Sequence, residues 1–257
     1  MKKARISEPA LQSGAAMAAG APRWIDDALI HLRESDPILA AIIERVGPLQ
    51  IRHRPQRFQA LVRAIIFQQL AGRAAQTIYG RFVTIVGGGR FPTPARVLAA
   101  SDDDLRRAGL SRGKMAYVRD LAAHVRDGAL SFHRFARMED EEIIADLIRV
   151  RGIGRWTAEM FLMFNLRRPD VFPVDDLGIR NAVAKVYRMD RPPTARELRE
   201  FGERWRPYRS AASWYLWRSV DVITPDGGKE KADKGMPAAP AKRAAHSRKR
   251  VSVRVAE

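Results

Sequence analysis

Cysteine is absent from the 257 residues of this chain. Its absence excludes disulfide bonds, thiolate zinc sites and cysteine-ligated iron–sulfur clusters. The five histidines are scattered and no two stand four residues apart, so the pattern predicts no histidine metal site. No apolar run is long enough to cross a bilayer, and no stretch alternates clearly between apolar and polar residues. The basic N-terminus precedes a segment that Gln, Ser and Gly interrupt, which makes a poor signal peptide. We therefore expect an all-α protein, located in the cytoplasm, without a bound metal.

Acidic residues are outnumbered, with 29 Asp and Glu against 46 Lys and Arg, which gives a formal net charge of +17. Of this surplus, +5 lies in residues 225–257 and +2 in residues 1–22, which leaves +10 on the segment between them. Such a surplus favours a polyanionic partner, through long-range attraction and the release of condensed counterions. Both terminal segments have the composition of disordered chain, so we expect one folded domain at 23–224.

Apolar residues recur at helical spacing through most of that domain. The clearest stripe predicts a core-facing helix from Phe58 to Gln69, with apolar side chains at Phe58, Leu61, Val62, Ile65 and Ile66. Further helices are expected over 24–35, 37–46, 72 to just before 87, 95–100, 102–108, 114–125, 139–150, 194–205 and 210–222.

The stretch from residue 146 to residue 183 carries the most specific pattern. An amphipathic helix end is followed by a turn whose two glycines, Gly152 and Gly154, tolerate a positive φ, and a second helix opens at Arg155. This helix, glycine turn and helix, at about 143–165, direct backbone N–H groups outward at a helix N-terminus, where a phosphate fits. We predict a phosphate grip made by the backbone of the two glycines and the charge of Arg155.

A pair of carboxylates, Asp175 and Asp176, follows this motif at the point where an apolar segment ends and another helix begins. Asp is a preferred helix N-cap, so capping is one interpretation of the pair. The pair also follows a segment expected to be buried and lies close in sequence to the phosphate grip, which favours a chemical role. The residues alone leave both interpretations open.

The pattern LxxxxGIGxxTA, the hydrophobic helix after it and PVDDxxI together resemble the helix-hairpin-helix DNA glycosylase superfamily, in particular its 3-methyladenine DNA glycosylase II branch. The run FPTPxxxLAAxxxxxLxxxGLxxxKxxY resembles the same branch, so the resemblance spans roughly 58–217. It implies a two-lobed helical bundle with the active-site cleft between the lobes, in the compact form without an N-terminal β-rich domain. It also implies an enzyme that flips alkylated purines of the 3-methyladenine type out of double-stranded DNA. The N-glycosidic bond is then hydrolysed and an abasic site is left.

The resemblance implies roles for individual residues. Asp176 matches the catalytic carboxylate, which stabilises positive charge on the deoxyribose or activates water, with Asp175 as cap or supporting acceptor. Trp156 stands where lyase-competent relatives have a Schiff-base lysine, which indicates a monofunctional glycosylase. Trp156, Met160 and Trp217 are expected to line the substrate pocket, although Met160 replaces an aromatic residue of a relative.

Gln69, in the turn FQQLA, matches a DNA-binding wedge residue that fills the base stack after flipping, and a solvated glutamine is the alternative. Arg151 replaces the proline usual in this hairpin, and we expect the turn to survive. Some members hold a monovalent cation on the carbonyls that match Ile148, Val150 and Gly152, but no side chain here requires one. We expect no other cofactor.

Two other functions remain open. A non-catalytic helix-hairpin-helix DNA-binding module would keep the glycines and the charge, but it would need neither the carboxylate at 176 nor the aromatics at 156 and 217. A bifunctional glycosylase/lyase for oxidised bases is opposed by Trp156 and by the absence of a cluster. We expect a monomer that is associated with the nucleoid, binds damaged duplex DNA and does not bind a membrane.

Overall fold

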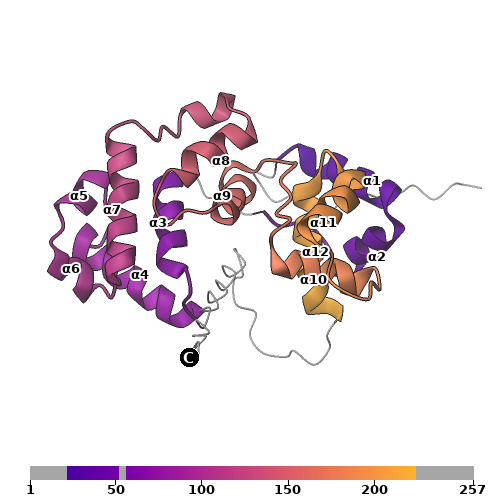
Figure 1. Ribbon diagram of the computed structural model, residues 1–257, viewed down its shortest axis with the longest axis horizontal. Helices are drawn as coiled ribbons and strands as arrows, with labels where there is room; N and C mark the ends of the chain where they lie inside the picture. The colour runs from indigo at the N-terminus through magenta and orange to yellow at the C-terminus, as the bar shows by residue number, and fades with distance from the viewer. Residues whose placement is uncertain (1–21, 52–55, 224–257) are drawn as a thin grey trace, which may run out of the picture.

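The computed structural model describes residues 22–51 and 56–223, which are helices and their connections (Figure 1). These residues contain no β-strand, so the all-α prediction is confirmed. The α-helices are α1 (Trp24–Ser35), α2 (Pro37–Val46), α3 (Arg57–Phe67), α4 (Gly72–Gly87), α5 (Pro94–Ala99), α6 (Asp102–Arg107), α7 (Arg112–Arg126), α8 (Asp140–Ile148), α9 (Arg155–Phe161), α10 (Leu177–Val186), α11 (Ala195–Phe201) and α12 (Arg209–Ile223). Two 3₁₀-helices, η1 (Arg134–Arg137) and η3 (Gly202–Trp205), and one π-helix, η2 (Leu162–Leu166), complete the elements of the described residues. The termini predicted to be disordered lie outside these residues, except for Pro22.

The helices form two groups in space (Figure 1). In one group, α3 packs against α4, α7 and α9, while α5 packs against α7 and α8 against α9. In the other group, α12 packs against α1, α2 and α10, and α1 packs against α2. The chain therefore leaves the second group after α2 and returns to it at α10. The catalytic cleft expected between two lobes stays a prediction.

The predicted core stripe of α3 is confirmed, since Leu61, Val62, Ile65 and Ile66 are at most 1% exposed. The helix ends two residues earlier than expected, at Phe67. Gln68 has a ψ of 130° and the next residue has a φ of +58°, so neither continues a right-handed helix. The two glutamines instead form the turn between α3 and α4.

Helix α9 runs into the π-helix η2, and every residue from 157 to 165 is buried. This central segment lies between the glycine turn and the loop that carries the carboxylate pair. The single helix expected over 194–205 is α11 followed by η3. An apolar run indicates a buried helix, but it does not distinguish α from 3₁₀ or π hydrogen bonding.

Within the described ranges, no helix has both the length and the apolar character that a membrane span requires. The same ranges contain no group of three or more His, Asp and Glu side chains placed to bind a metal ion.

Candidate active site

Asp176 lies at the N-cap of α10 and is only 4% exposed. Its Oδ1 accepts the backbone N–H of Ile179 at 2.8 Å and the indole N–H of Trp217 at 3.0 Å. Its Oδ2 accepts the indole N–H of Trp156 at 2.7 Å. A carboxylate offers about four lone-pair directions, so three donors leave one acceptor position, on Oδ2. One residue therefore caps the helix, holds two indoles and retains an unused acceptor position.

Asp175 was expected to be the cap or a supporting acceptor, and the cap is Asp176 instead. Asp175 is exposed, whereas Asp176 has the extended backbone of an N-cap, with φ −71° and ψ 117°, and stands three residues before the N–H that it accepts. The two interpretations of the pair, capping and chemistry, thus apply to the same side chain.

Trp156 of α9 precedes Asp176 in the chain and Trp217 of α12 follows it. Both indole N–H groups donate to its carboxylate. Both indoles are half-buried, and the ring of Trp217 stacks on Phe164 of η2, with centroids 6.1 Å apart and planes at 28°. The structure thus brings three of the predicted site residues together. It also gives the indoles a role that the sequence did not indicate, as donors to Asp176.

Met160 is not exposed at all, with a relative accessibility of 0%. The helix that carries it is buried from Thr157 onward, so this side chain packs in the core and lines no open pocket. The prediction that Met160 lines the substrate pocket is contradicted by this placement.

Asp176, Trp156 and Trp217 form what we call the carboxylate cluster. Gly178, the second residue of α10, leaves room for it. A Cβ at this position would lie 2.9 Å from Oδ1 of Asp176 and 3.4 Å from Cδ1 of Trp217. Any other residue here would press on the hydrogen bond between the carboxylate and the indole.

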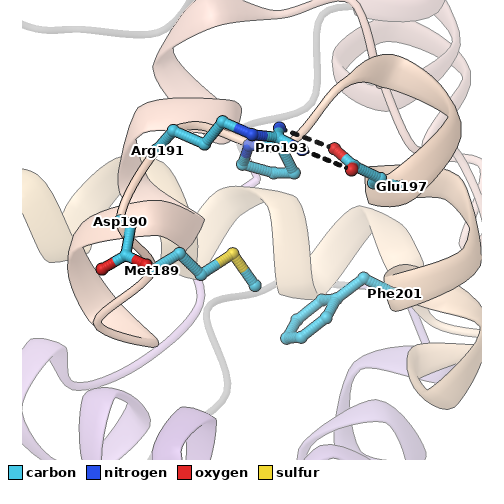
Figure 2. A pocket seen from close by; sticks show the side chains of 6 residues that line it. All are labelled: Met189, Asp190, Arg191, Pro193, Glu197 and Phe201. Atoms are coloured by element: carbon cyan, nitrogen blue, oxygen red, sulfur yellow. Dashed lines mark hydrogen bonds and ion pairs between the residues drawn. The ribbon is translucent and has the colours of Figure 1, made fainter.

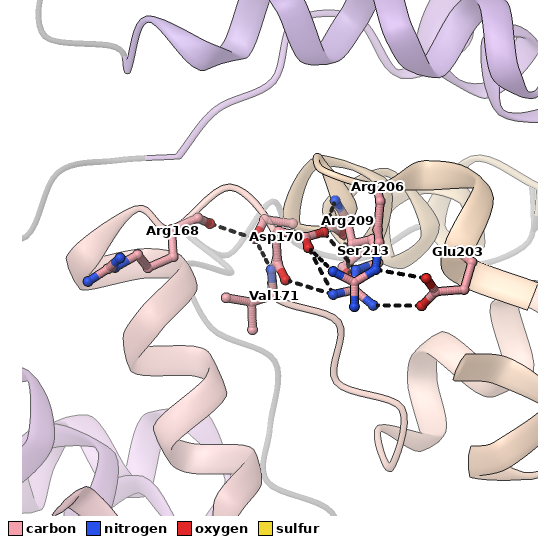
Figure 3. Close-up of polar contacts among 8 residues, drawn as sticks. Arg168, Asp170, Val171, Glu203, Arg206, Arg209 and Ser213 are labelled. Carbon is pink, nitrogen blue, oxygen red and sulfur yellow. Dashed lines mark hydrogen bonds and ion pairs between the residues drawn. The ribbon is translucent and has the colours of Figure 1, made fainter. Parts of the chain in front are cut away.

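A charged network at the start of α12 holds the loop before the carboxylate pair (Figure 3). Asp170 accepts from Nε and Nη2 of Arg209 at 2.7 and 2.9 Å, and from Nη1 of Arg206 at 2.9 Å. Both arginines also pair with Glu203. Ser210 donates to the carbonyl of Arg168 at 2.6 Å and accepts the N–H of Val171 at 2.9 Å. The network therefore ties the segment that leads to Asp176 onto the helix that carries Trp217.

The two glycines of the turn have different backbone conformations. Gly152 has φ +86°, and a Cβ on it would lie 2.4 Å from Cδ2 of Tyr117 on α7, so only glycine fits. Gly154 has φ −96° as the N-cap of α9, and no side chain caps that helix. A Cβ on Gly154 would meet nothing within 4 Å. The turn thus uses the tolerance of a positive φ at Gly152, whereas Gly154 has the extended backbone of an N-cap.

Side chains from two other helices hold this turn. Gln68 donates from Nε2 to the carbonyl of Gly152 at 2.8 Å, and Asp120 on α7 accepts the backbone N–H of Arg151 at 2.8 Å. A proline at 151 could not donate that hydrogen bond. The turn survives the replacement of the usual proline by Arg151, as expected, and the hydrogen bond to Asp120 holds it. Of the three carbonyls considered for a cation, the one of Gly152 already accepts from Gln68.

Arg155 is paired with two carboxylates instead of standing open to a phosphate. It forms an ion pair with Glu141 of α8, and its Nε lies 3.1 Å from Oε1 of Glu159. Glu159 is only 5% exposed, and burial raises the pKa of its carboxyl to about 7 although Arg155 opposes this shift. A phosphate that contacts Arg155 would share the guanidinium with these two carboxylates. No local pattern in the sequence indicated this pairing.

Gln69 is exposed and belongs to the turn between α3 and α4, apart from the carboxylate cluster. Its φ of +58° is unusual for a residue with a Cβ. The side chain engaged with the hairpin is that of its neighbour, Gln68.

A cavity of about 500 Å³ opens between α11 and the loop that joins α10 to α11 (Figure 2). It is lined by Met189, Asp190, Arg191, Pro193, Glu197 and Phe201. Arg191 and Glu197 form a two-pronged ion pair in its lining. None of the predicted site residues lines this cavity.

Comparisons with known proteins show which family the chain resembles over most of its length. The family model described as HhH-GPD superfamily base excision DNA repair protein matches residues 62–207. DNA-3-methyladenine glycosylase 1 of Schizosaccharomyces pombe is 36% identical over 194 residues, which cover 74% of this chain and 85% of that protein.

Two solved structures are similar over most of their length. The 3-methyladenine DNA glycosylase of Schizosaccharomyces pombe in complex with abasic DNA matches with a TM-score of 0.67 and 35% identity, over 76% of this chain and 97% of that one. A DNA-3-methyladenine glycosidase of Bacillus halodurans matches with a TM-score of 0.71 and 36% identity, over 76% and 90% of the two chains.

Proposed function

The chain belongs to the HhH-GPD superfamily of base excision DNA repair proteins, and we propose that it hydrolyses the N-glycosidic bond of alkylated purines in double-stranded DNA. The observation that carries this proposal is the buried carboxylate of Asp176, held by two indole N–H groups and retaining one free acceptor position on Oδ2. The related glycosylases of Schizosaccharomyces pombe and Bacillus halodurans are named for 3-methyladenine, which supports alkylated purines as the substrate class.

In the proposed mechanism, the damaged nucleotide leaves the base stack and Gln69 fills the gap. The bond between C1′ and the purine nitrogen breaks, and its electron pair neutralises the cationic alkylated base. Positive charge develops on the deoxyribose, where Oδ2 of Asp176 stabilises it. Water then adds to C1′ and gives up its proton, which leaves an abasic site. Because the leaving base is already cationic, a separate general acid is not required.

The hydrogen bonds at Asp176 support this role physically. Two indole N–H groups and one backbone N–H donate to its oxygens and occupy three of the acceptor positions that the carboxylate offers. They also fix the rotamer, so the free lone pair of Oδ2 has one direction. A preorganised charge of this kind stabilises a transition state without reorganisation during the reaction.

The proposed contact with DNA phosphate uses the uncapped start of α9 and the open backbone at Gly154. Arg155 contributes its charge once a phosphate competes with Glu141 for the guanidinium. A monomer, a location in the cytoplasm on the nucleoid, and a monovalent cation on the hairpin carbonyls stay predictions.

We further propose that the enzyme is monofunctional. Trp156 stands where a lyase would need an amine, and its N–H is engaged by Asp176. The product should therefore be abasic DNA whose strand stays intact until alkali is added. Borohydride should trap no covalent complex with lesion-containing DNA, and efficient trapping of the wild type would refute this part of the proposal.

The deciding experiment is incubation with duplexes that carry 3-methyladenine, 7-methylguanine, hypoxanthine, uracil or 8-oxoguanine, each followed by alkaline cleavage. Excision of the methylated purines is the expected result. Binding to all five duplexes without excision of any base would instead support a non-catalytic helix-hairpin-helix module. Preferential release of 8-oxoguanine with strand cleavage would support the bifunctional alternative.

A further inference from the structure

The turn between α3 and α4 presents Gln69 on a left-handed backbone. This conformation is disfavoured for any residue with a Cβ and persists only where neighbouring contacts hold it. Gln69 itself is exposed, so the contacts that hold this conformation are made to the residues next to it in the chain.

Lys114, in the first turns of α7, supplies two of those contacts. Its Nζ donates to the carbonyl of Ile66 at 2.6 Å and to the carbonyl of Gln68 at 2.8 Å. Within the described residues, no carboxylate lies at ion-pair distance from this ammonium. Burial lowers the pKa of Lys114, which is consistent with a side chain directed into the protein. The positive charge of Lys114 thus stabilises two backbone carbonyls at the turn.

The second of these carbonyls distinguishes the arrangement from simple helix capping. A lysine near a helix end often binds the last carbonyls of the helix, and Ile66 belongs to that class. Gln68 lies beyond the end of α3, and its carbonyl belongs to the peptide bond that leads into Gln69. The ammonium therefore restrains the peptide that sets the direction of the exposed glutamine.

The same turn is attached to the hairpin by the side chain of Gln68, which donates to the carbonyl of Gly152 at 2.8 Å. Lys114 holds the backbone of the turn and Gln68 holds it against the glycine turn. The segment that would enter the base stack and the segment that would contact phosphate are thereby linked.

We propose that Lys114 is a positioning residue for base flipping, which acts through Gln69 by holding the peptide that presents this side chain. The inference rests on the proposed glycosylase function and on Gln69 as the wedge. It predicts that loss of the ammonium impairs flipping and leaves the chemistry at Asp176 intact.

The test is a double-mutant cycle of Lys114→Met and Gln69→Ala. Single-turnover excision is measured at saturating enzyme, on the lesion that the wild type excises best, placed opposite its pairing base and opposite a mismatched base. Lys114→Met should lower excision from the pair about tenfold and from the mismatch less than about twofold, because flipping from a mismatch is already easy. In the Gln69→Ala background, Lys114→Met should have no further effect.

Arg112→Met is the matched control, since it removes one positive charge from an exposed position two residues earlier on the same helix. It should change excision from both substrates by the same factor. Melting transitions of all variants establish that each one is folded at the temperature of the excision assay. If Lys114→Met does not fold, Lys114→Gln takes its place. The ratio of its excision rates on the paired and the mismatched lesion then tests the inference in the same way.

Three outcomes would overturn the inference while leaving the glycosylase function standing. These are equal losses on paired and mismatched lesions, an additive loss in the double mutant, and full activity of Lys114→Met on the paired lesion. A wild type that excises no lesion from either duplex would overturn the proposed function and this inference together.

Discussion

Replacing Asp176 by Asn exchanges one acceptor oxygen of the cluster for a donor NH₂ group. In one amide orientation the NH₂ faces the indole N–H of Trp156, and in the other it faces the N–H groups of Trp217 and Ile179. At least one buried N–H loses its acceptor in either case. The expected loss of unfolding free energy is therefore roughly 1–3 kcal/mol.

The same substitution removes the negative charge that stabilises the developing positive sugar. Excision should fall by ~10²-fold or more, the scale of losing one preorganised electrostatic contact. The assay is single-turnover excision of an alkylated purine at saturating enzyme, at a temperature where thermal unfolding shows that the variant is folded. Saturation separates the chemical step from weakened DNA binding.

Asp175→Asn is the matched control, because it makes the identical chemical change one residue earlier on an exposed side chain. Its unfolding free energy should stay within roughly 0.5 kcal/mol of the wild type, and its excision rate should be close to normal. An active Asp176→Asn beside an inactive Asp175→Asn would refute the assignment. A stability loss in Asp176→Asn without any loss of excision would leave Asp176 as a helix cap alone.

Three further predictions concern the surroundings of the site. Burial raises the pKa of Glu159 from 4.5 to about 7, so the folded protein keeps a proton that the unfolded chain has released. Its contribution to stability should fall by up to roughly 3 kcal/mol as the pH rises from about 4.5 through 7. Glu159→Gln should abolish that decline. The measurement is the free energy of urea unfolding of wild type and variant at pH 5 and at pH 8. The same difference between the two proteins at both pH values would contradict the prediction. Gly178→Ala should lower excision about tenfold or more, because its Cβ would lie 2.9 Å from Oδ1 of Asp176. Gly80→Ala, whose Cβ would meet nothing within 4 Å, should stay active, and equal activity of the two variants would argue against crowding at the site. Deleting residues 226–257 removes a charge of +5 and should make the salt dependence of binding to undamaged duplex shallower. Single-turnover excision at saturation should stay unchanged, and a clear loss of that rate would contradict a purely electrostatic role.

Helical periodicity predicted the all-α class because burial of one face repeats along each helix regardless of its partner. The stripe of α3 shows this, since Leu61 and Ile65 are buried as the spacing indicates. The end of the same helix could not be predicted in this way. Gln68 and Gln69 have ordinary helix propensity, and the turn that they form is held by Lys114 of another helix and by the carbonyl of Gly152.

The candidate site was predicted in part. The pattern around the hairpin singled out Asp176, and the structure makes it a buried carboxylate with three donors. Met160 was placed wrongly because a position one turn beyond Trp156 does not reveal that α9 is buried from Thr157 onward. Asp170 was missed because its partners, such as Arg209, lie 39 residues away in the chain.

The sequence by itself determined the helical class, the glycine turn and the carboxylate pair, and with them the family, since these depend on composition and on residues close together in the chain. The tertiary structure alone decided which atoms meet. Trp156 and Trp217 stand 20 and 41 residues from Asp176, and they reach its two oxygens only because α9, α10 and α12 pack in one arrangement. The pairing of Arg155 with Glu141, 14 residues earlier, depends in the same way on how α8 lies against α9. No local pattern specifies such distances, because they follow from the packing of whole helices and not from the spacing of residues along one of them.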